Sequence, residues 1–124
     1  MSCARIGNQL KMTLALGLRT ESRAFYREVL GCRVLASPRP DLDLWEFEGG
    51  FVLGLFFVPS DEVLSDAQYD RAPWLEIQAT DSAAMKARLL AFGVPEVDYE
   101  DRTRFYFRAP GGCVFRLAPL GGGI

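Results

Sequence analysis

The sequence predicts an α+β fold made of two tandem βαβββ modules, each a strand, a helix and three more strands. The segment GGFVLGL at 49–55 returns as GGCVFRL at 111–117, which is 62 residues later. Helical patterns at 20–30 and 82–92 keep the same offset, and each is followed by a glycine. A repeat of this length indicates a duplicated supersecondary unit. We therefore expect a single domain over 1–124, with modules over about 9–59 and 72–119 and a linker over about 60–71.

The first module begins with an apolar strand and continues with a helix whose apolar residues have helical spacing. Thr20 suits the N-cap of this helix, and Gly31 suits the left-handed position after it. Gly49 and Gly50 suit a hairpin turn. The elements expected in this module are 11–18, 20–30, 32–37, 42–48 and 51–58.

The second module repeats this order after a linker with room for one helical turn. Asp81 or Ser82 suits the N-cap of its helix, and Gly111 and Gly112 suit its last hairpin turn. The elements expected here are 73–79, 82–92, 96–100, 104–108 and 113–118.

Composition narrows the possible partners and location. The net charge is -2 without a basic cluster, so the chain is not expected to bind nucleic acid. The longest apolar run, 51–59, is too short to span a bilayer, and the charged pattern after 11–18 is not that of a signal peptide. Three scattered cysteines have neither metal spacing nor an even number. We expect a cytoplasmic protein with reduced thiols and no membrane partner.

The chain contains no histidine. Imidazole is the commonest protein ligand of catalytic transition metals and the usual general base near neutral pH. Its absence weakens many enzyme hypotheses, and Cys113 has no base near it in sequence that would make it a nucleophile.

Alternation in the predicted strands separates two faces of each sheet. In 74–79, Leu75 and Ile77 share the face expected to cover the helix, whereas Trp74, Glu76 and Gln78 lie on the other face. In 114–118, Arg116 lies opposite Phe115 and Leu117. The face that carries Trp74, Glu76, Gln78 and Arg116 therefore suits a polar or partly open concave surface.

Two segments carry a family resemblance that covers nearly the whole chain. AFYREVLG at 24–31 resembles the first helix, and RFYFRAPGG at 104–112 the closing hairpin, of the vicinal oxygen chelate superfamily of glyoxalases, bleomycin-resistance proteins and extradiol dioxygenases. Ala109 and Gly112 replace the usual Asp and Asn of that hairpin. The resemblance implies a cup-shaped mixed β-sheet with helices on its outer face.

The resemblance also implies four positions where metal-dependent members hold a divalent ion. Here these positions read Met12, Gly54, Trp74 and Arg116, and none of these residues suits Mg, Mn, Fe or Zn. A shift of one residue on the first strand offers only Lys11 or Thr13. The sequence is therefore more similar to the metal-free drug-binding branch, and we expect no metal, no cofactor and no catalytic residue.

The leading interpretation is a protein that sequesters a small aromatic molecule, an antibiotic or another toxic metabolite, in a metal-free cup. Aromatic walls with a few convergent polar groups suit a planar ligand. The candidate ligand contacts are Trp74, Arg116, Glu76, Gln78, Met12, Trp45, Phe56 and Tyr106. The resemblance implies a homodimer, with the cup built from two chains or closed within one.

Plainer interpretations stay open. Trp74 suits an ordinary core position, and Arg116 suits an exposed strand or an ion pair with Glu76. One alternative function is a lyase- or isomerase-type enzyme with unusual chemistry, for which Glu76, Tyr99 and Tyr106 are the acid and base candidates. Another is an interaction module whose cup is filled by side chains.

Overall fold

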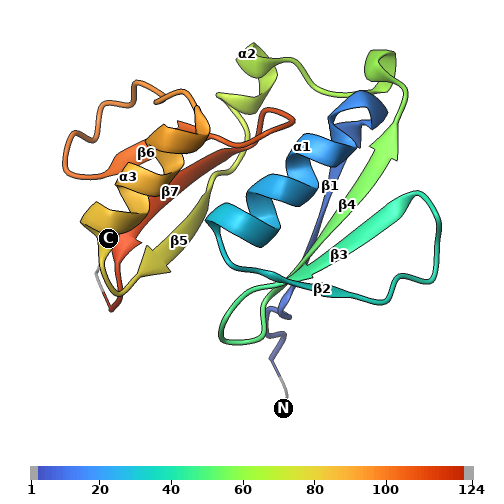
Figure 1. The fold of residues 1–124 in the computed structure, drawn as a ribbon, viewed down its shortest axis with the longest axis horizontal. Coiled ribbons are helices and arrows are strands. Elements are labelled where there is room, and N and C mark those ends of the chain that lie inside the picture. The colour runs from blue at the N-terminus through green and yellow to red at the C-terminus, as the bar shows by residue number, and fades with distance from the viewer. Residues whose placement is uncertain (1–2, 122–124) are drawn as a thin grey trace.

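Two sheets and the helices packed on them form the fold, here described from a computed structural model over residues 3–121 (Figure 1). Module one contains β1 Gln9–Ala15, the 3-10 turn η1 Leu16–Leu18, α1 Arg19–Ala24, the π-helical turn η2 Phe25–Val29, β2 Arg33–Leu35, β3 Leu42–Glu46 and β4 Val52–Val58. The linker contains the 3-10 turn η3 Ser60–Glu62 and α2 Asp66–Tyr69. Module two contains β5 Leu75–Ala79, α3 Ser82–Phe92, β6 Phe105–Arg108 and β7 Val114–Pro119.

The two sheets share the pairing of first, last and preceding strand, although within residues 3–121 the second lacks a counterpart of β2, and this shared pairing confirms the α+β fold of two related modules. The first sheet (sheet A) has the order β1-β4-β3-β2, and the second (sheet B) has the order β5-β7-β6. In each, the module's first strand pairs in parallel with its last, and that last strand pairs with its antiparallel neighbour. The modules form two separate sheets, and neither is a closed barrel.

The local signals for helix ends and turns have mixed outcomes. Asp81 caps α3 by accepting a hydrogen bond from the Ala84 amide at 3.0 Å, and Gly93 ends the helix in the left-handed region, both as predicted. Ser65 and Gln68 form a capping box for the helical turn expected in the linker. The predicted cap at Thr20 is wrong, because α1 already begins at Arg19.

The strand predicted over 96–100 is also wrong. Only Glu96 forms a bridge, opposite Phe107, flanked by hydrogen bonds from Val97 N to Tyr106 O at 2.8 Å and from Arg108 N to Pro95 O at 3.0 Å. The residues that follow are rich in carboxylates, which have low strand propensity and favour solvent. The segment therefore leaves the sheet after one bridge.

The repeat offset is not constant along the modules. Arg116 pairs with Glu76 and Gly54 pairs with Lys11, so the counterpart of Glu76 is Lys11, 65 residues earlier. Between its first strand and Gly31, module one contains the η1 turn and the wider π-helical turn η2, which have no counterpart in the described residues of module two. The sequence offset of 62 therefore holds for the last strands and for the glycines after the helices, but it misaligns the first strands by three residues.

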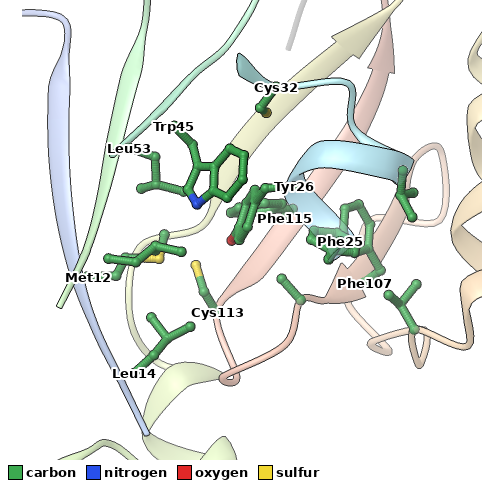
Figure 2. Close-up of a cluster of buried hydrophobic side chains, with 14 of the residues drawn as sticks. Met12, Leu14, Phe25, Tyr26, Cys32, Trp45, Leu53, Phe107, Cys113 and Phe115 are labelled. Atoms are coloured by element: carbon green, nitrogen blue, oxygen red, sulfur yellow. The ribbon is translucent and has the colours of Figure 1, made fainter. Parts of the chain in front are cut away.

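One hydrophobic core serves both modules, because η2 lies between the two sheets. Tyr26 stacks on Trp45 of sheet A with ring centroids 6.2 Å apart, and it contacts Phe115 of sheet B edge-on at 6.4 Å (Figure 2). Phe25 packs beside Phe107 in the same layer. Each sheet therefore turns one face to this shared core and the other face away from it, and we call the latter the open face.

Candidate functional site

The open face of sheet B brings together most of the predicted ligand contacts. Arg116 in β7 lies beside Glu76 in β5 and Tyr106 in β6, one residue on each of three neighbouring strands. Trp74 stands just before β5, and Gln78 follows Glu76 on the same face of that strand. Strand alternation, predicted from the sequence, therefore places these five side chains on one surface.

Arg116 lies at the centre of this surface and is only 3% exposed. Its Nη2 donates to Glu76 Oε2, and its Nη1 lies 4.0 Å from Asp101 Oδ2. Its guanidinium carbon lies 4.4 Å from the centroid of the Trp74 ring. Burial disfavours the charge, but Glu76 and Tyr106 more than offset it and raise the pKa of Arg116. Arg116 is thus a fixed, neutralised cation beneath Trp74, and it forms the ion pair with Glu76 that the sequence offers as one interpretation.

Two of the acid and base candidates, Glu76 and Tyr106, are engaged in hydrogen bonds on this face. Burial raises the pKa of Glu76, but hydrogen bonds from Arg116 and from Gln78, at 3.0 Å, lower it below its usual value overall. Burial and a hydrogen bond donated to Asp101, at 3.0 Å, raise the pKa of Tyr106. Glu76 is therefore an ion-paired carboxylate and Tyr106 a neutral phenol, so neither is poised for proton transfer.

Aromatic rings lie against the partly buried ion pair. Trp74 meets Tyr106 edge-on with centroids 5.7 Å apart, and Tyr99 lies against the same Tyr106 ring at 4.6 Å. Beside them is a cleft of about 310 Å³, whose lining includes Tyr99, Tyr106, Glu96, Asp98, Asp101 and Arg102. We call Trp74, Tyr99 and Tyr106 the aromatic wall. A half-buried Trp and a cleft of this size suit the flat face of a small ring system.

The open face of sheet A is simpler. Lys11 and Gly54 are register partners, and the Lys11 ammonium lies 5.4 Å from the centroid of the Phe56 ring. A Cβ on Gly54 would meet Leu42 and Leu44 at 3.5 Å, so the glycine leaves a shallow apolar floor there. This face carries a cation over an aromatic ring where sheet B carries a closed ion-pair network.

The predicted site residues fall into three places. Trp74, Glu76, Gln78, Tyr106 and Arg116 share the open face of sheet B, and Phe56 lies on the open face of sheet A. Met12 and Trp45 belong to the shared core, where they are 9% and 0% exposed. Met12 was matched to Trp74 by a constant offset of 62, whereas the strand register makes Gln9 the counterpart of Trp74 and Lys11 the counterpart of Glu76. Trp45 faces Tyr26, so neither residue enters the proposed site.

Sequence analysis missed the role of Asp101. This residue lies beyond the predicted strand, and its carboxylate accepts hydrogen bonds from the Thr103 amide and the Tyr106 hydroxyl. An Asp two residues before a Thr is a common turn pattern, which carries no sign of a partner on a distant strand. Lys11 was named only as the product of a register shift, and the pairing of β1 with β4 was needed to select it.

The donor set does not fit a metal ion. The equivalent positions of the two modules hold Lys11 and Gly54 in one and Glu76 and Arg116 in the other. The single carboxylate among them is already paired with an arginine. Within residues 3–121, no group of three or more His, Cys, Asp or Glu side chains is placed to bind a metal ion. These four positions therefore lack the donors that a divalent ion requires.

Comparison with solved structures decides the fold. The glyoxalase I of Leishmania major is 24% identical, with a TM-score of 0.72, over 94% of this chain and 87% of that one. The fosfomycin resistance protein FosX of Listeria monocytogenes is 14% identical, with a TM-score of 0.70, over 99% and 94%. The chain has the glyoxalase fold. No family model and no curated protein sequence matches it.

The glyoxalase fold also occurs in an antibiotic-binding protein. TnmS3 from Streptomyces sp. CB03234 is 20% identical to this chain, with a TM-score of 0.60, over 96% of this chain and 98% of that one. Neighbours of this fold therefore include proteins named for resistance, for antibiotic binding and for glyoxalase activity. Identities this low establish the fold alone. No helix within 3–121 has the length and apolar character needed to cross a bilayer.

Proposed function

We propose that this chain is a small-molecule binding protein that holds an aromatic compound, antibiotic-like or a toxic metabolite, against the aromatic wall of sheet B. The observation that carries the proposal is the Arg116 network. A buried, neutralised guanidinium stacks beneath Trp74 and fixes the indole at the surface, where it can stack on a planar ring. No metal is needed for this recognition. The antibiotic-binding neighbour of the same fold supports the proposal.

The cup of this binding site is proposed to form between two copies of the chain. The open faces of sheets A and B both point away from the shared core, so a single chain does not bring them together. A second copy can set the open face of its sheet A opposite the aromatic wall. We expect a homodimer in sedimentation equilibrium, and a monomer that binds ligand with full affinity would overturn the two-chain cup.

N-phenyl-1-naphthylamine, a neutral planar fluorophore that brightens in apolar sites, tests the proposed function. Titration of the protein should give saturable binding, and Trp74→Ala should weaken that binding about tenfold or more because stacked aromatic area is lost. Trp45→Phe is the matched control, because the only other tryptophan is fully buried in the core. Its affinity should be unchanged.

The same titration has a second readout. Trp74 emission should be quenched as the fluorophore binds, whereas emission from Trp45 should change little. Circular dichroism checks that Trp74→Ala is folded. If the folded variant binds the fluorophore as strongly as the wild type, the proposed function is contradicted.

A further inference from the structure

We infer that the ligand is an organic anion whose acidic group is bound by Lys11. This inference rests on the proposed function and names the chemical class of its ligand. It comes from the charges of the two open faces. Three arginines of these faces form ion pairs with carboxylates, whereas Lys11 forms none within residues 3–121.

Arg116, Arg33 and Arg39 on the open faces are already paired with carboxylates. Arg116 pairs with Glu76 and lies near Asp101 on sheet B. On sheet A, Arg33 pairs with Glu46, and Arg39 binds Asp41 through two hydrogen bonds of 2.9 Å each. A paired guanidinium offers a ligand acid less net charge than an unpaired ammonium does, so these arginines are weaker anion sites than Lys11.

Lys11 differs in having no carboxylate partner within the described part of the chain. It projects from β1 beside Gly54, and its ammonium stays over the Phe56 ring. Its neighbours on the same face of β1, Gln9 and Thr13, are uncharged. The ammonium therefore has no counter-charge on this face, and its cross-strand partner Gly54, over which Leu42 and Leu44 pack, places no side chain of its own beside it.

The surroundings of Lys11 also select for an aromatic acid over a small inorganic anion. Phe56, Leu42 and Leu44 form an apolar floor beside Lys11, and the guanidinium carbon of Arg39, which is paired with Asp41, lies 5.5 Å from the centroid of the same Phe56 ring. A single uncompensated ammonium beside an apolar floor lacks the several converging donors that hold inorganic phosphate or sulfate. It matches a molecule with one acidic group on an aromatic body. The ring would pack on the floor and the aromatic wall while the acid meets Lys11.

Two fluorophores with the same ring skeleton test the inference. The anion 8-anilinonaphthalene-1-sulfonate differs from neutral N-phenyl-1-naphthylamine by one sulfonate group. The wild type should bind the sulfonate about tenfold more tightly, and Lys11→Met should remove this preference while keeping binding of the neutral probe. Lys11→Arg should keep the preference. Added salt should weaken only the sulfonate.

Lys86 offers a matched control variant. Its ammonium lies 4.9 Å from the Phe105 ring, so it is also a lysine over an aromatic ring, but on α3 and away from both open faces. Lys86→Met should leave the preference for the sulfonate intact. Equal loss in Lys86→Met and Lys11→Met would overturn the inference, because the effect would then follow net charge.

The two proposals fail in different ways. If the neutral probe binds through Trp74 but the sulfonate binds no more tightly, the anion inference is overturned and the binding function stands. The same conclusion follows if the preference survives Lys11→Met. If neither probe binds the wild type, both proposals are overturned.

Discussion

At the scale of single residues, Arg116 explains why the open face of sheet B is both polar in sequence and largely closed in structure. Its side chain is 4% exposed, and its two carboxylate partners and the Trp74 ring shield it from water. A buried ion pair contributes little net stability when both partners are present. Removal of one partner destabilises the fold, because the other charge is then left without a counter-charge. The residue therefore matters for the shape of the site more than for direct ligand contact.

Arg116→Ala should lower the free energy of unfolding by about 3 kcal/mol, because Glu76 loses its counter-charge and Trp74 loses its support. Arg33→Ala is the control. Arg33 also pairs with a strand glutamate, but its side chain is 73% exposed, so the expected loss is about 1 kcal/mol or less. Urea unfolding of both variants checks this. Equal losses would mean that the Arg116 pair behaves as an exposed one.

The sequence predicts individual residues unevenly. Alternation correctly grouped Trp74, Glu76 and Arg116, because strand pleating is a local property. It could not say that Arg116 is buried, since that depends on rings from β6 and on Asp101 in a loop. Met12 was misplaced because the position of a residue across a sheet depends on register, which a repeat count transfers only when both modules have equal connections.

At the scale of elements, the two hairpin turns of the repeat show how one sequence motif serves different surroundings. Gly49 and Gly111 both adopt positive φ, 96° and 98°, as their shared GG motif predicts. A Cβ on Gly49 would meet nothing within 4 Å, whereas a Cβ on Gly111 would lie 2.5 Å from the buried Leu14 side chain. The second turn therefore closes against the first module, a contact that no local pattern encodes.

Alanine at these two glycines should separate backbone strain from steric overlap. Gly49→Ala should cost about 1 to 2 kcal/mol of unfolding free energy from the left-handed backbone alone. Gly111→Ala should cost a further 1 to 3 kcal/mol, roughly, because Leu14 must move within a packed core. Thermal or urea unfolding of the pair measures the difference. Equal losses of unfolding free energy in the two variants would show that the Leu14 side chain moves aside at no energetic cost.

At the scale of the whole molecule, stability should depend on pH only outside the neutral range, because the chain has no histidine. Despite burial, hydrogen bonds from Arg23 and Arg19 lower the pKa of Asp43. Those from Arg116 and Gln78 lower the pKa of Glu76. Lowered carboxyl pKa values stabilise the fold above the unfolded values of about 4, and this stability is lost as the pH falls through the folded values.

The pKa shifts of the core thiols are opposite in direction to those of the carboxyl groups. It raises the pKa of Cys32 and of Cys113 to about 12, from the ordinary 9.0, and raises that of Tyr26 well above its usual value. Stability from these groups is complete below their unfolded pKa values and is lost as the pH rises toward the folded ones. Urea unfolding should therefore show a plateau from about pH 5 to 8, with losses on both sides. A steep slope between pH 6 and 8 would contradict this assignment.

The shared core also determines how the two modules associate. Tyr26 and Phe25 of one module complete their packing only against Phe107 and Phe115 of the other. The linker, with its two short helical turns, keeps these partners tethered at an effective concentration in the millimolar range. Two separate modules would have to meet by diffusion and would part on dilution. Joined in one chain, they assemble their interior independently of how much protein is present, and only the proposed pairing of open faces responds to concentration.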